Sequence, residues 1–463
     1  MSAATKGGGR ASRRAIGLRL GRSLALQQKR RSLERNEQII SSPLPAIAHA
    51  ELRLAGSAIL FSQNTGAWHS RWAMLRPFPF VCRIVLPASL LLAWISTAHS
   101  ESAYTVATPA VLPGTPAAES SQPAAGTRLV SGADSHFRYE GRFDRTDPAA
   151  PVVVWQGSRI RIDFTGDQLV LCFDGFKDQT FFDIHVDDAT AVLAVPVGAG
   201  QRVACPLPLT GGHHHLLLFK RSEAAAGFAR FRGIEIAPAA EVATPAAPCY
   251  RLAMEFIGDS ITVGACNEDG AADQWESRRT HNNALSYGAL TAAAFAADYR
   301  NIAASGMGIV VGWVPFHAAE AWDRVYPDPK SPKADLSAWT PDVVFVNLGE
   351  NDDSFTHAKG LPFPATFSAE YVSLVRSIRL AHPAASIVLL RGGMYGGAKS
   401  PALRQAWEAA VAELEGTDPR ITHFVFQHWS SNHPRVSDDR AMADELIPWL
   451  NLQSFIATRP GLQ

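Results

Sequence analysis

Four short polar segments carry residue types that could together perform acyl transfer. The first contains the hydroxyl of Ser260 in "GDS", the second is a glycine-rich turn at Gly306, the third carries the carboxamide of Asn351 in "GENDD", and the fourth contains His433 before a proline. Acyl transfer needs a nucleophile, a general base and donors for a developing oxyanion. The four segments supply all of these groups.

Each segment taken alone is also typical of an ordinary turn, because Gly, Asp, Asn and Ser are common turn residues. His433 moreover has two competitors in the same region, His423 and His428. The catalytic interpretation therefore depends on whether the fold brings the four segments together.

The elements between the segments predict that it does. Between residues 250 and 458, apolar strands alternate with amphipathic helices, which predicts a mostly parallel sheet with helices on both faces. Loops after parallel strands open on one edge of the sheet, where ligands bind. We expect strands at 252–257, 300–304, 342–349, 386–392 and 421–426, and helices at 286–299, 367–382, 401–416 and 438–450.

A second domain is expected before this one. Residues 128–237 contain short runs such as "RIRIDF", "TFFDIHV" and "HHHLLLFKR", separated by turn residues, without a comparable helical period. Period-two runs at this spacing predict a β-sandwich. Proline- and alanine-rich stretches at 101–127 and 238–249 are expected to be linkers.

The N-terminal part of the chain predicts export. Two arginines, the apolar run Ile84–Thr97 and the small residues Ala98 and Ser100 resemble a signal peptide over residues 74–100. Residues 1–73 would then be an over-extended start, with Met74 as the true first residue, or else a basic arm followed by an anchor. We expect a secreted or periplasmic protein with no stable membrane span in its mature form, because the apolar run is shorter than ~20 residues.

Composition excludes some other functions. The chain has 43 Lys and Arg against 43 Asp and Glu, so its net charge gives no reason to expect nucleic acid as a partner. Cys82 lies in the expected signal peptide, and the four remaining cysteines permit disulfides whose pairing the sequence does not specify. The His213–His215 run places only two histidines on one strand face, so we expect no metal and no other cofactor.

The four segments resemble the sequence blocks of the SGNH, or GDSL-type, hydrolases. In addition, "HFRYEGRFDRTDPAAPVVVWQGSRIRIDFTGDQLVL" (136–171) resembles the N-terminal jelly-roll domain of the family 2 carbohydrate esterases, which precedes an SGNH domain in that family. The resemblance covers about residues 128–458. It implies an α/β fold, an SGNH-type three-layer sandwich with a parallel sheet, preceded by a jelly-roll-like β-sandwich.

The resemblance also assigns roles to individual residues. It implies that Ser260 is the nucleophile and His433 its base, and that the amides of Ser260 and Gly306 and the side chain of Asn351 form the oxyanion hole. Asp259 would shape the nucleophile loop.

Two positions depart from the usual SGNH pattern. Ser430 stands where most members have an aspartate that orients the histidine, and Glu350 stands where a small uncharged residue is usual. We therefore expect a Ser260–His433 dyad in which a main-chain carbonyl before His433 accepts the Nδ1–H. Glu350 is the nearest carboxylate in the motifs that could act instead.

The expected activity is removal of acetyl groups from polysaccharides such as xylan or glucomannan. Trp275, Trp313 and Trp429 either stack on sugar rings or belong to the core. Two alternatives remain at this point: an SGNH acylhydrolase acting on lipids or thioesters, and a sugar-binding protein with a decayed site.

Overall fold

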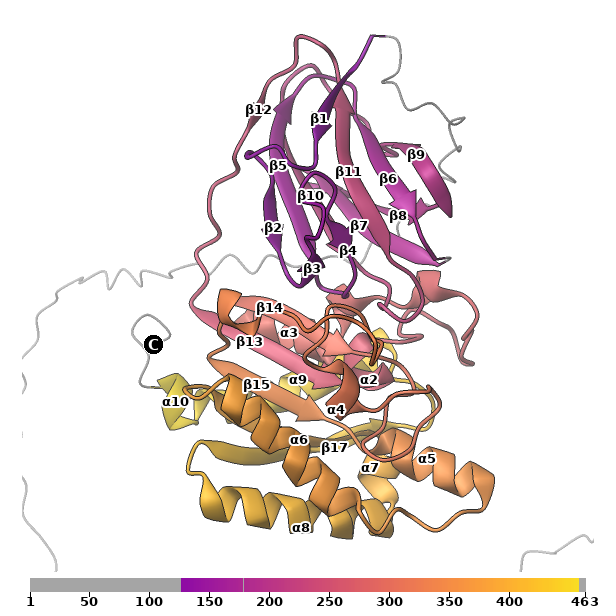
Figure 1. Cartoon of the computed structure of the whole chain (residues 1–463), viewed down its shortest axis with the longest axis vertical. Coiled ribbons are helices and arrows are strands. Elements are labelled where there is room, and N and C mark those ends of the chain that lie inside the picture. Colours follow the sequence, from indigo (N-terminus) through magenta and orange to yellow (C-terminus); the bar gives the residue numbers. More distant parts are fainter. Residues whose placement is uncertain (1–125, 178, 458–463) are drawn as a thin grey trace, which may run out of the picture. The chain divides into compact units, whose positions relative to one another are not determined.

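The structure, a computed structural model, describes residues 126–177 and 179–457 (Figure 1). The expected arm at 1–73, the signal peptide at 74–100 and all but the end of the linker at 101–127 lie outside the described residues. No helix within the described ranges is both long enough and apolar enough to cross a membrane.

The first described domain consists of two antiparallel sheets, as expected for a β-sandwich. One sheet has the order β3-β4-β11-β6-β9, with β1 also paired to β11, and the other has the order β12-β5-β10-β7-β8, with β2 also paired to β5. The strands are β1 (Arg128–Ser131), β2 (Arg138–Glu140), β3 (Phe143–Asp144), β4 (Val152–Val153), β5 (Arg159–Thr165), β6 (Val170–Gly175), β7 (Thr180–Val186), β8 (Ala189–Val195), β9 (Gly198–Ala204), β10 (His213–Lys220), β11 (Ala229–Ile236) and β12 (Val242–Ala243).

Alternating side chains explain the core of the sandwich. In β10, His214, Leu216 and Leu218 are buried, whereas His213 and His215 on the opposite face are exposed. Because successive side chains of a strand point to opposite faces, each sheet buries one apolar face against the other. β12 lies within the expected linker 238–249 and pairs with β5.

The second domain has a five-stranded sheet of order β14-β13-β15-β16-β17, and every adjacent pair is parallel. This confirms the expected fold class. The strands are β13 (Leu252–Gly258), β14 (Ala297–Ala303), β15 (Val343–Asn347), β16 (Ser386–Met394) and β17 (Ile421–Ser430). The α-helices are α2 (Ser260–Val263), α3 (Tyr287–Ala294), α4 (Ala318–Ala321), α5 (Glu350–Lys359), α6 (Phe367–Ala381), α7 (Tyr395–Lys399), α8 (Pro401–Thr417), α9 (Val436–Asn451) and α10 (Ser454–Ala457).

The central strands are apolar on both faces because helices cover both. Val344 and Val346 of β15 pack in one cluster with residues of α6 and α8, whereas Val343 and Phe345 pack in another with residues of α3 and α9. These helices form the outer two layers around the sheet (Figure 1). Continuous apolar runs are typical of strands buried in this way.

Two expected elements differ from the structure. The helix expected at 286–299 ends at Ala294, because Ala296 takes a left-handed φ of 47° and β14 begins at Ala297. The "GENDD" segment, expected as a loop, forms the first turn of α5, with Gly349 as its N-cap.

The two domains pack through a buried polar and apolar interface. Trp155 of the sandwich is 1% exposed and belongs to the same hydrophobic cluster as the helices α6 and α8. Arg142 Nη2 donates to Glu255 Oε1 at 3.1 Å, and Gln156 Nε2 donates to Asn301 Oδ1 at 2.6 Å. Burying such polar groups requires matched partners, so the domains fit each other in a defined arrangement.

Candidate active site

The nucleophile candidate Ser260 lies where β13 ends and α2 begins. Asp259 caps this helix, and its Oδ1 accepts a hydrogen bond from the amide of Ile261 at 3.1 Å. A Cβ at Gly258 would lie 2.1 Å from Thr262 Oγ1, so only glycine fits before the turn. The fold therefore explains the first two residues of "GDS": Gly258 fits a crowded position, and Asp259 caps the helix. It leaves Ser260 at the carboxyl edge of the sheet, as expected.

The two backbone amides expected to bind an oxyanion are not used by the fold. Within the described ranges, the N–H groups of Ser260 and Gly306 donate to no protein acceptor. Gly306 has φ of +84°, and a Cβ there would lie 3.1 Å from Cβ of Trp313. Because a left-handed residue in a crowded turn favours glycine, the backbone around this amide is specified by its sequence.

Asn351, the third oxyanion candidate, contacts the nucleophile loop directly. Its Nδ2 donates to Asp259 Oδ2 at 3.1 Å and to the carbonyl oxygen of Met307 at 3.1 Å. The first three segments are thereby joined by hydrogen bonds. Both hydrogens of the Asn351 amide face protein acceptors, so donation to an oxyanion would exchange one of these bonds.

His433 is oriented by a carboxylate rather than by a backbone carbonyl. Its Nδ1 lies 2.7 Å from Asp273 Oδ2, and Arg435 Nη2 lies 2.8 Å from Asp273 Oδ1. Partial burial raises the pKa of Asp273, but the hydrogen bond with His433 and the close contact with the Arg435 guanidinium outweigh it and hold the pKa below its usual value. The expected dyad with a main-chain carbonyl is therefore wrong for this structure. Asp273 can fix the tautomer and stabilise an imidazolium.

Ser430 takes no part in holding the histidine. Its hydroxyl accepts a hydrogen bond from the amide of Asn432 at 3.3 Å and has no other hydrogen bond in the described part of the chain. Asp273 lies 160 positions before His433, in the loop after α2, so no short motif relates the two residues. The polar segment "NEDGAADQW", which begins at Asn267 shortly after the nucleophile helix, was the available signal for its position.

Trp275 from the same loop packs against the histidine. Its ring centroid is 5.2 Å from that of His433 at an interplanar angle of 24°, and the guanidinium of Arg278 lies 3.9 Å from its ring centroid. Trp275 thus supports the imidazole. It also packs against a small apolar cluster of Val263, Ala265 and Ala303, which agrees with the core alternative rather than with sugar stacking. No hydrogen bond joins Ser260 and His433, and neither the hydroxyl nor Nε2 bonds another protein group in the described ranges. Catalytic hydrogen bonds often form only with substrate.

Glu350 is turned toward the backbone of a neighbouring loop. Its two carboxylate oxygens accept from the amides of Gly396 at 3.0 Å and Gly397 at 2.8 Å, at the start of α7. Burial raises its pKa. Burial, followed by the charge of Glu350, also raises the pKa of Asp259 to about 8. Glu350 thus acts on the nucleophile loop through charge and does not orient His433.

The described residues bring together one group of three with metal-ligand atoms, Cys266, Asp273 and His433. Asp273 and His433 are already bonded to each other, and burial raises the pKa of the Cys266 thiol, which disfavours the thiolate that binds metals. In the His213–His215 run, His215 Nδ1 lies 2.7 Å from Asp163 Oδ1. The four cysteines in the described ranges are unpaired: Cys172, Cys205, Cys249 and Cys266.

Comparisons with known proteins agree with this architecture. Residues 139–246 match the family model "Carbohydrate esterase 2 N-terminal", and residues 256–446 match "GDSL-like Lipase/Acylhydrolase family". The chain is 30% identical over 318 residues to the cellulase/esterase CelE of Acetivibrio thermocellus, which covers 66% of this chain and 38% of that protein. The chain thus spans less than half the length of that relative.

A second relative is matched over most of its length. It is an acetylxylan esterase / glucomannan deacetylase of Cellvibrio japonicus, 29% identical over 329 residues, which cover 67% of this chain and 88% of that protein. Among solved structures, a family two carbohydrate esterase from Clostridium thermocellum in complex with cellohexaose superposes with a TM-score of 0.59 at 26% identity, covering 68% of this chain and 98% of that one. The chain therefore matches the GDSL-type hydrolase model over its α/β domain and resembles the family 2 carbohydrate esterases in both of its domains.

Proposed function

We propose that the protein is a secreted or periplasmic carbohydrate O-acetyl esterase that acts through an acetyl-enzyme on Ser260. The observation that carries this proposal is the 2.7 Å contact between His433 Nδ1 and Asp273. This contact orients the imidazole, and His433 follows β17 of the same sheet whose strand β13 ends before Ser260. A site that had lost its chemistry would have no need to keep this carboxylate on the histidine.

The first half of the reaction follows from these positions. Ser260 Oγ attacks the acetyl carbonyl carbon and gives its proton to His433 Nε2, while Asp273 stabilises the imidazolium. The amides of Ser260 and Gly306 stabilise the oxyanion, with Asn351 as a third donor. The tetrahedral intermediate then collapses, the sugar hydroxyl leaves with the proton from His433, and Ser260 remains acetylated.

The second half uses the same groups with water. His433 takes a proton from a water molecule, which attacks the acetyl carbon, and the new intermediate releases acetate as Ser260 regains its proton. No cofactor enters either half of this scheme.

Exposed aromatic side chains near the site support a carbohydrate substrate. Trp313 is 51% exposed, and its backbone amide donates to the carbonyl oxygen of Gly306 at 2.8 Å. Tyr395 is 59% exposed, with its ring 6.1 Å from that of Trp429 at the ends of β16 and β17. Exposed aromatic faces are suited to packing against the apolar faces of sugar rings.

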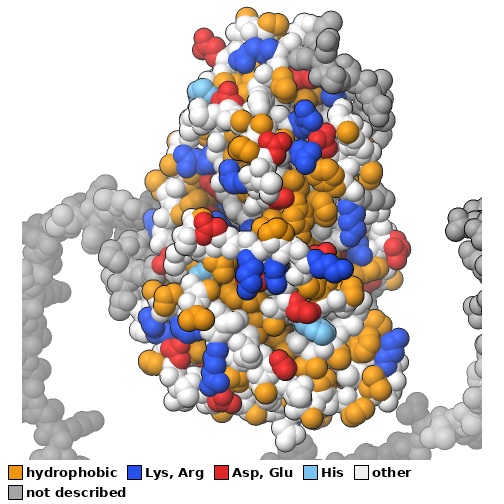
Figure 2. Space-filling view, in the orientation of Figure 1, with side chains coloured by type: hydrophobic (Ala, Val, Ile, Leu, Met, Phe, Trp, Pro, Cys, Tyr) orange, Lys and Arg blue, Asp and Glu red, His pale blue; other side chains and the backbone are white. Residues whose placement is uncertain are grey.

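One face of the described residues shows mixed charges rather than a site for a polyanion. On the face shown in Figure 2, basic and acidic side chains are interspersed and no large patch of one sign is present. This agrees with the balanced charge of the chain. The proposal of export rests on the signal-like segment at residues 74–100.

The test measures acetate released from acetylated xylan and acetylated glucomannan by the purified protein, beside a series of 4-nitrophenyl esters from acetate to octanoate. We expect acetate release from at least one polysaccharide and a kcat/KM that falls as the acyl chain lengthens. Preference for octanoate without acetate release would instead indicate a lipid or thioester acylhydrolase. Polysaccharide binding with no turnover of any ester would indicate a sugar-binding protein.

A further inference from the structure

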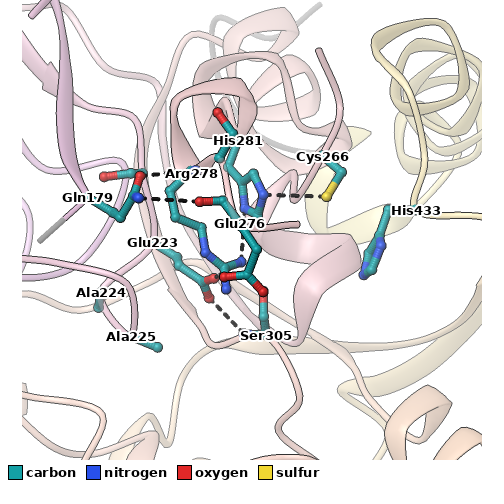
Figure 3. Close-up of polar contacts among 12 residues, drawn as sticks. Gln179, Glu223, Ala224, Ala225, Cys266, Glu276, Arg278, His281, Ser305 and His433 are labelled. Atoms are coloured by element: carbon teal, nitrogen blue, oxygen red, sulfur yellow. Dashed lines mark hydrogen bonds and ion pairs between the residues drawn. The ribbon is translucent and has the colours of Figure 1, made fainter. Parts of the chain in front are cut away.

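The β-sandwich contributes one buried carboxylate to the polar network beside the candidate active site. Glu223 lies in the turn after β10 and is 1% exposed. Its Oε2 accepts a hydrogen bond from the amide of Ser305 at 2.9 Å, and its Oε1 accepts one from Arg278 Nη1 at 3.2 Å (Figure 3). Both of these donors belong to the α/β domain, so Glu223 bonds across the domain interface.

The first bond acts on the oxyanion side of the site. The amide of Ser305 immediately precedes that of Gly306, one of the two backbone donors that the fold leaves unbonded in the described ranges. The Ser305 N–H belongs to the planar peptide unit 304–305, and only the φ and ψ of Ser305 separate this unit from the one that carries the Gly306 N–H. A buried bond from the Ser305 amide to a carboxylate therefore limits the directions in which the Gly306 N–H can point.

The second bond acts on the histidine side. Arg278 carries the guanidinium that lies on Trp275, and Trp275 stacks on His433. The sandwich also holds the backbone of this loop, because Gln179 Nε2 donates to the carbonyl oxygen of Glu276 at 3.2 Å and its Oε1 accepts from the amide of Arg278 at 3.3 Å. The segment that supports the imidazole is thus fixed from the other domain.

We propose that Glu223 is a positioning residue for the esterase reaction, aligning the Gly306 amide through Ser305 and His433 through Arg278 and Trp275. The proposal rests on the function proposed above and extends the catalytic unit into the β-sandwich. It also gives a physical reason for the two domains to occur together, since the α/β domain alone lacks the carboxylate that bonds both Ser305 and Arg278.

Glu223→Gln is the most informative change because it keeps the shape and removes one acceptor. Glu223 meets two N–H donors with two oxygens, whereas glutamine would turn its own NH₂ toward one of them. A small displacement of a reacting group can cost up to about 100-fold in rate. We expect kcat on 4-nitrophenyl acetate to fall about 10- to 100-fold, with KM within about threefold, because Glu223 does not touch the substrate.

Asp174→Asn is the matched control. Asp174 is also a buried carboxylate of the sandwich, 5% exposed, and accepts from one backbone amide, that of Gly200 at 2.9 Å, and from Arg230 and Arg232 at 3.4 Å each. None of these partners belongs to the α/β domain. We expect Asp174→Asn to lower the melting temperature about as much as Glu223→Gln does, while its kcat stays within about twofold of wild type.

Arg278→Lys tests the histidine side with a variant that retains the charge. One ammonium group cannot both bond Glu223 and lie flat on Trp275 as the guanidinium does. We expect kcat to fall at least fivefold with KM unchanged. Wild-type kcat in Arg278→Lys would remove the histidine side of the proposal, even if Glu223→Gln failed to fold.

The outcomes separate this inference from the proposed function. Equal kcat values for Glu223→Gln and Asp174→Asn, with Ser260→Ala inactive, would overturn the positioning role and leave the esterase intact. Full activity in Ser260→Ala would overturn the proposed function itself. A fall in kcat confined to Glu223→Gln and Arg278→Lys would support the positioning role.

Discussion

Asp273→Asn probes the contact that the sequence did not predict. In the structure, His433 Nδ1 and Arg435 Nη2 approach different oxygens of the Asp273 carboxylate, at 2.7 and 2.8 Å. Asparagine offers one oxygen in place of two, so one donor must face an NH₂ group. A hydrogen bond to a charged group contributes about 1.5–3 kcal/mol. A guanidinium has only donors, whereas an imidazole nitrogen can accept, so we expect Arg435 to take the oxygen.

The change at His433 should lower kcat/KM in two ways. The NH₂ group of the introduced asparagine would donate to Nδ1, which places the imidazole proton on Nε2 and blocks it as a base. Restoring the productive orientation would cost about 1.5–3 kcal/mol, and loss of the carboxylate beside the imidazolium costs a similar amount in the transition state. Together these give about 3–6 kcal/mol, or a fall of about 10²- to 10⁴-fold in kcat/KM at about 1.36 kcal/mol per decade.

The assay is kcat/KM on 4-nitrophenyl acetate, with the melting temperature measured to confirm folding. Asp269→Asn is the control, because Asp269 lies in the same loop and accepts from the amide of Gln274 at 2.6 Å, a bond that asparagine can retain. We expect this control to stay within about tenfold of wild type. The reasoning would be refuted if Asp273→Asn also stayed within tenfold, since a neutral contact would then suffice to hold His433.

Three further predictions follow from the site. Ser430→Ala should change kcat/KM less than about threefold, because Ser430 bonds only the amide of Asn432 in the described ranges; a loss above 100-fold would restore it as a partner of His433. Trp313→Ala should raise KM for acetylated xylan about 5- to 20-fold but leave 4-nitrophenyl acetate turnover within twofold, and equal effects on both substrates would argue against a sugar-binding role. The pKa of Asp259 is raised to about 8 in the folded chain, which therefore keeps a proton that the unfolded chain releases above about pH 4. The contribution of this group to the free energy of unfolding should fall as the pH rises from about 4 to 8, by up to about 1.4 kcal/mol per pH unit. The melting temperature of Asp259→Asn should therefore decline less between pH 5 and 8 than that of wild type, and parallel declines would contradict the shift.

The elements that the sequence predicted well are those with strong local signals. Buried apolar runs specified β13, β15 and β16, and amphipathic periodicity with a proline at the start specified α8. The carboxyl ends of the parallel strands β13, β14 and β15 then brought three of the four segments to one hydrogen-bonded cluster, in which Asn351 contacts Asp259 and Met307.

The elements that it missed depend on tertiary contacts. The alanine-rich run after Tyr287 has high helix propensity, yet residues from Ala297 onward pair with β13, and sheet formation overrides propensity there. Asp273 was missed because it lies 160 positions from His433 in the sequence, and contacts between such distant residues follow no fixed spacing. The orientation of Glu350 depends on two amides at the start of α7, and no sequence pattern links that helix to this carboxylate.

The role of Ser260 as nucleophile is tested most directly by labelling the protein with a fluorophosphonate, followed by intact mass and peptide mapping. We expect a single adduct, on Ser260, which forms at least 100-fold more slowly in His433→Ala and is absent in Ser260→Ala, in parallel with loss of acetate release from acetylated xylan. An adduct on another residue, with activity retained in Ser260→Ala, would contradict this role.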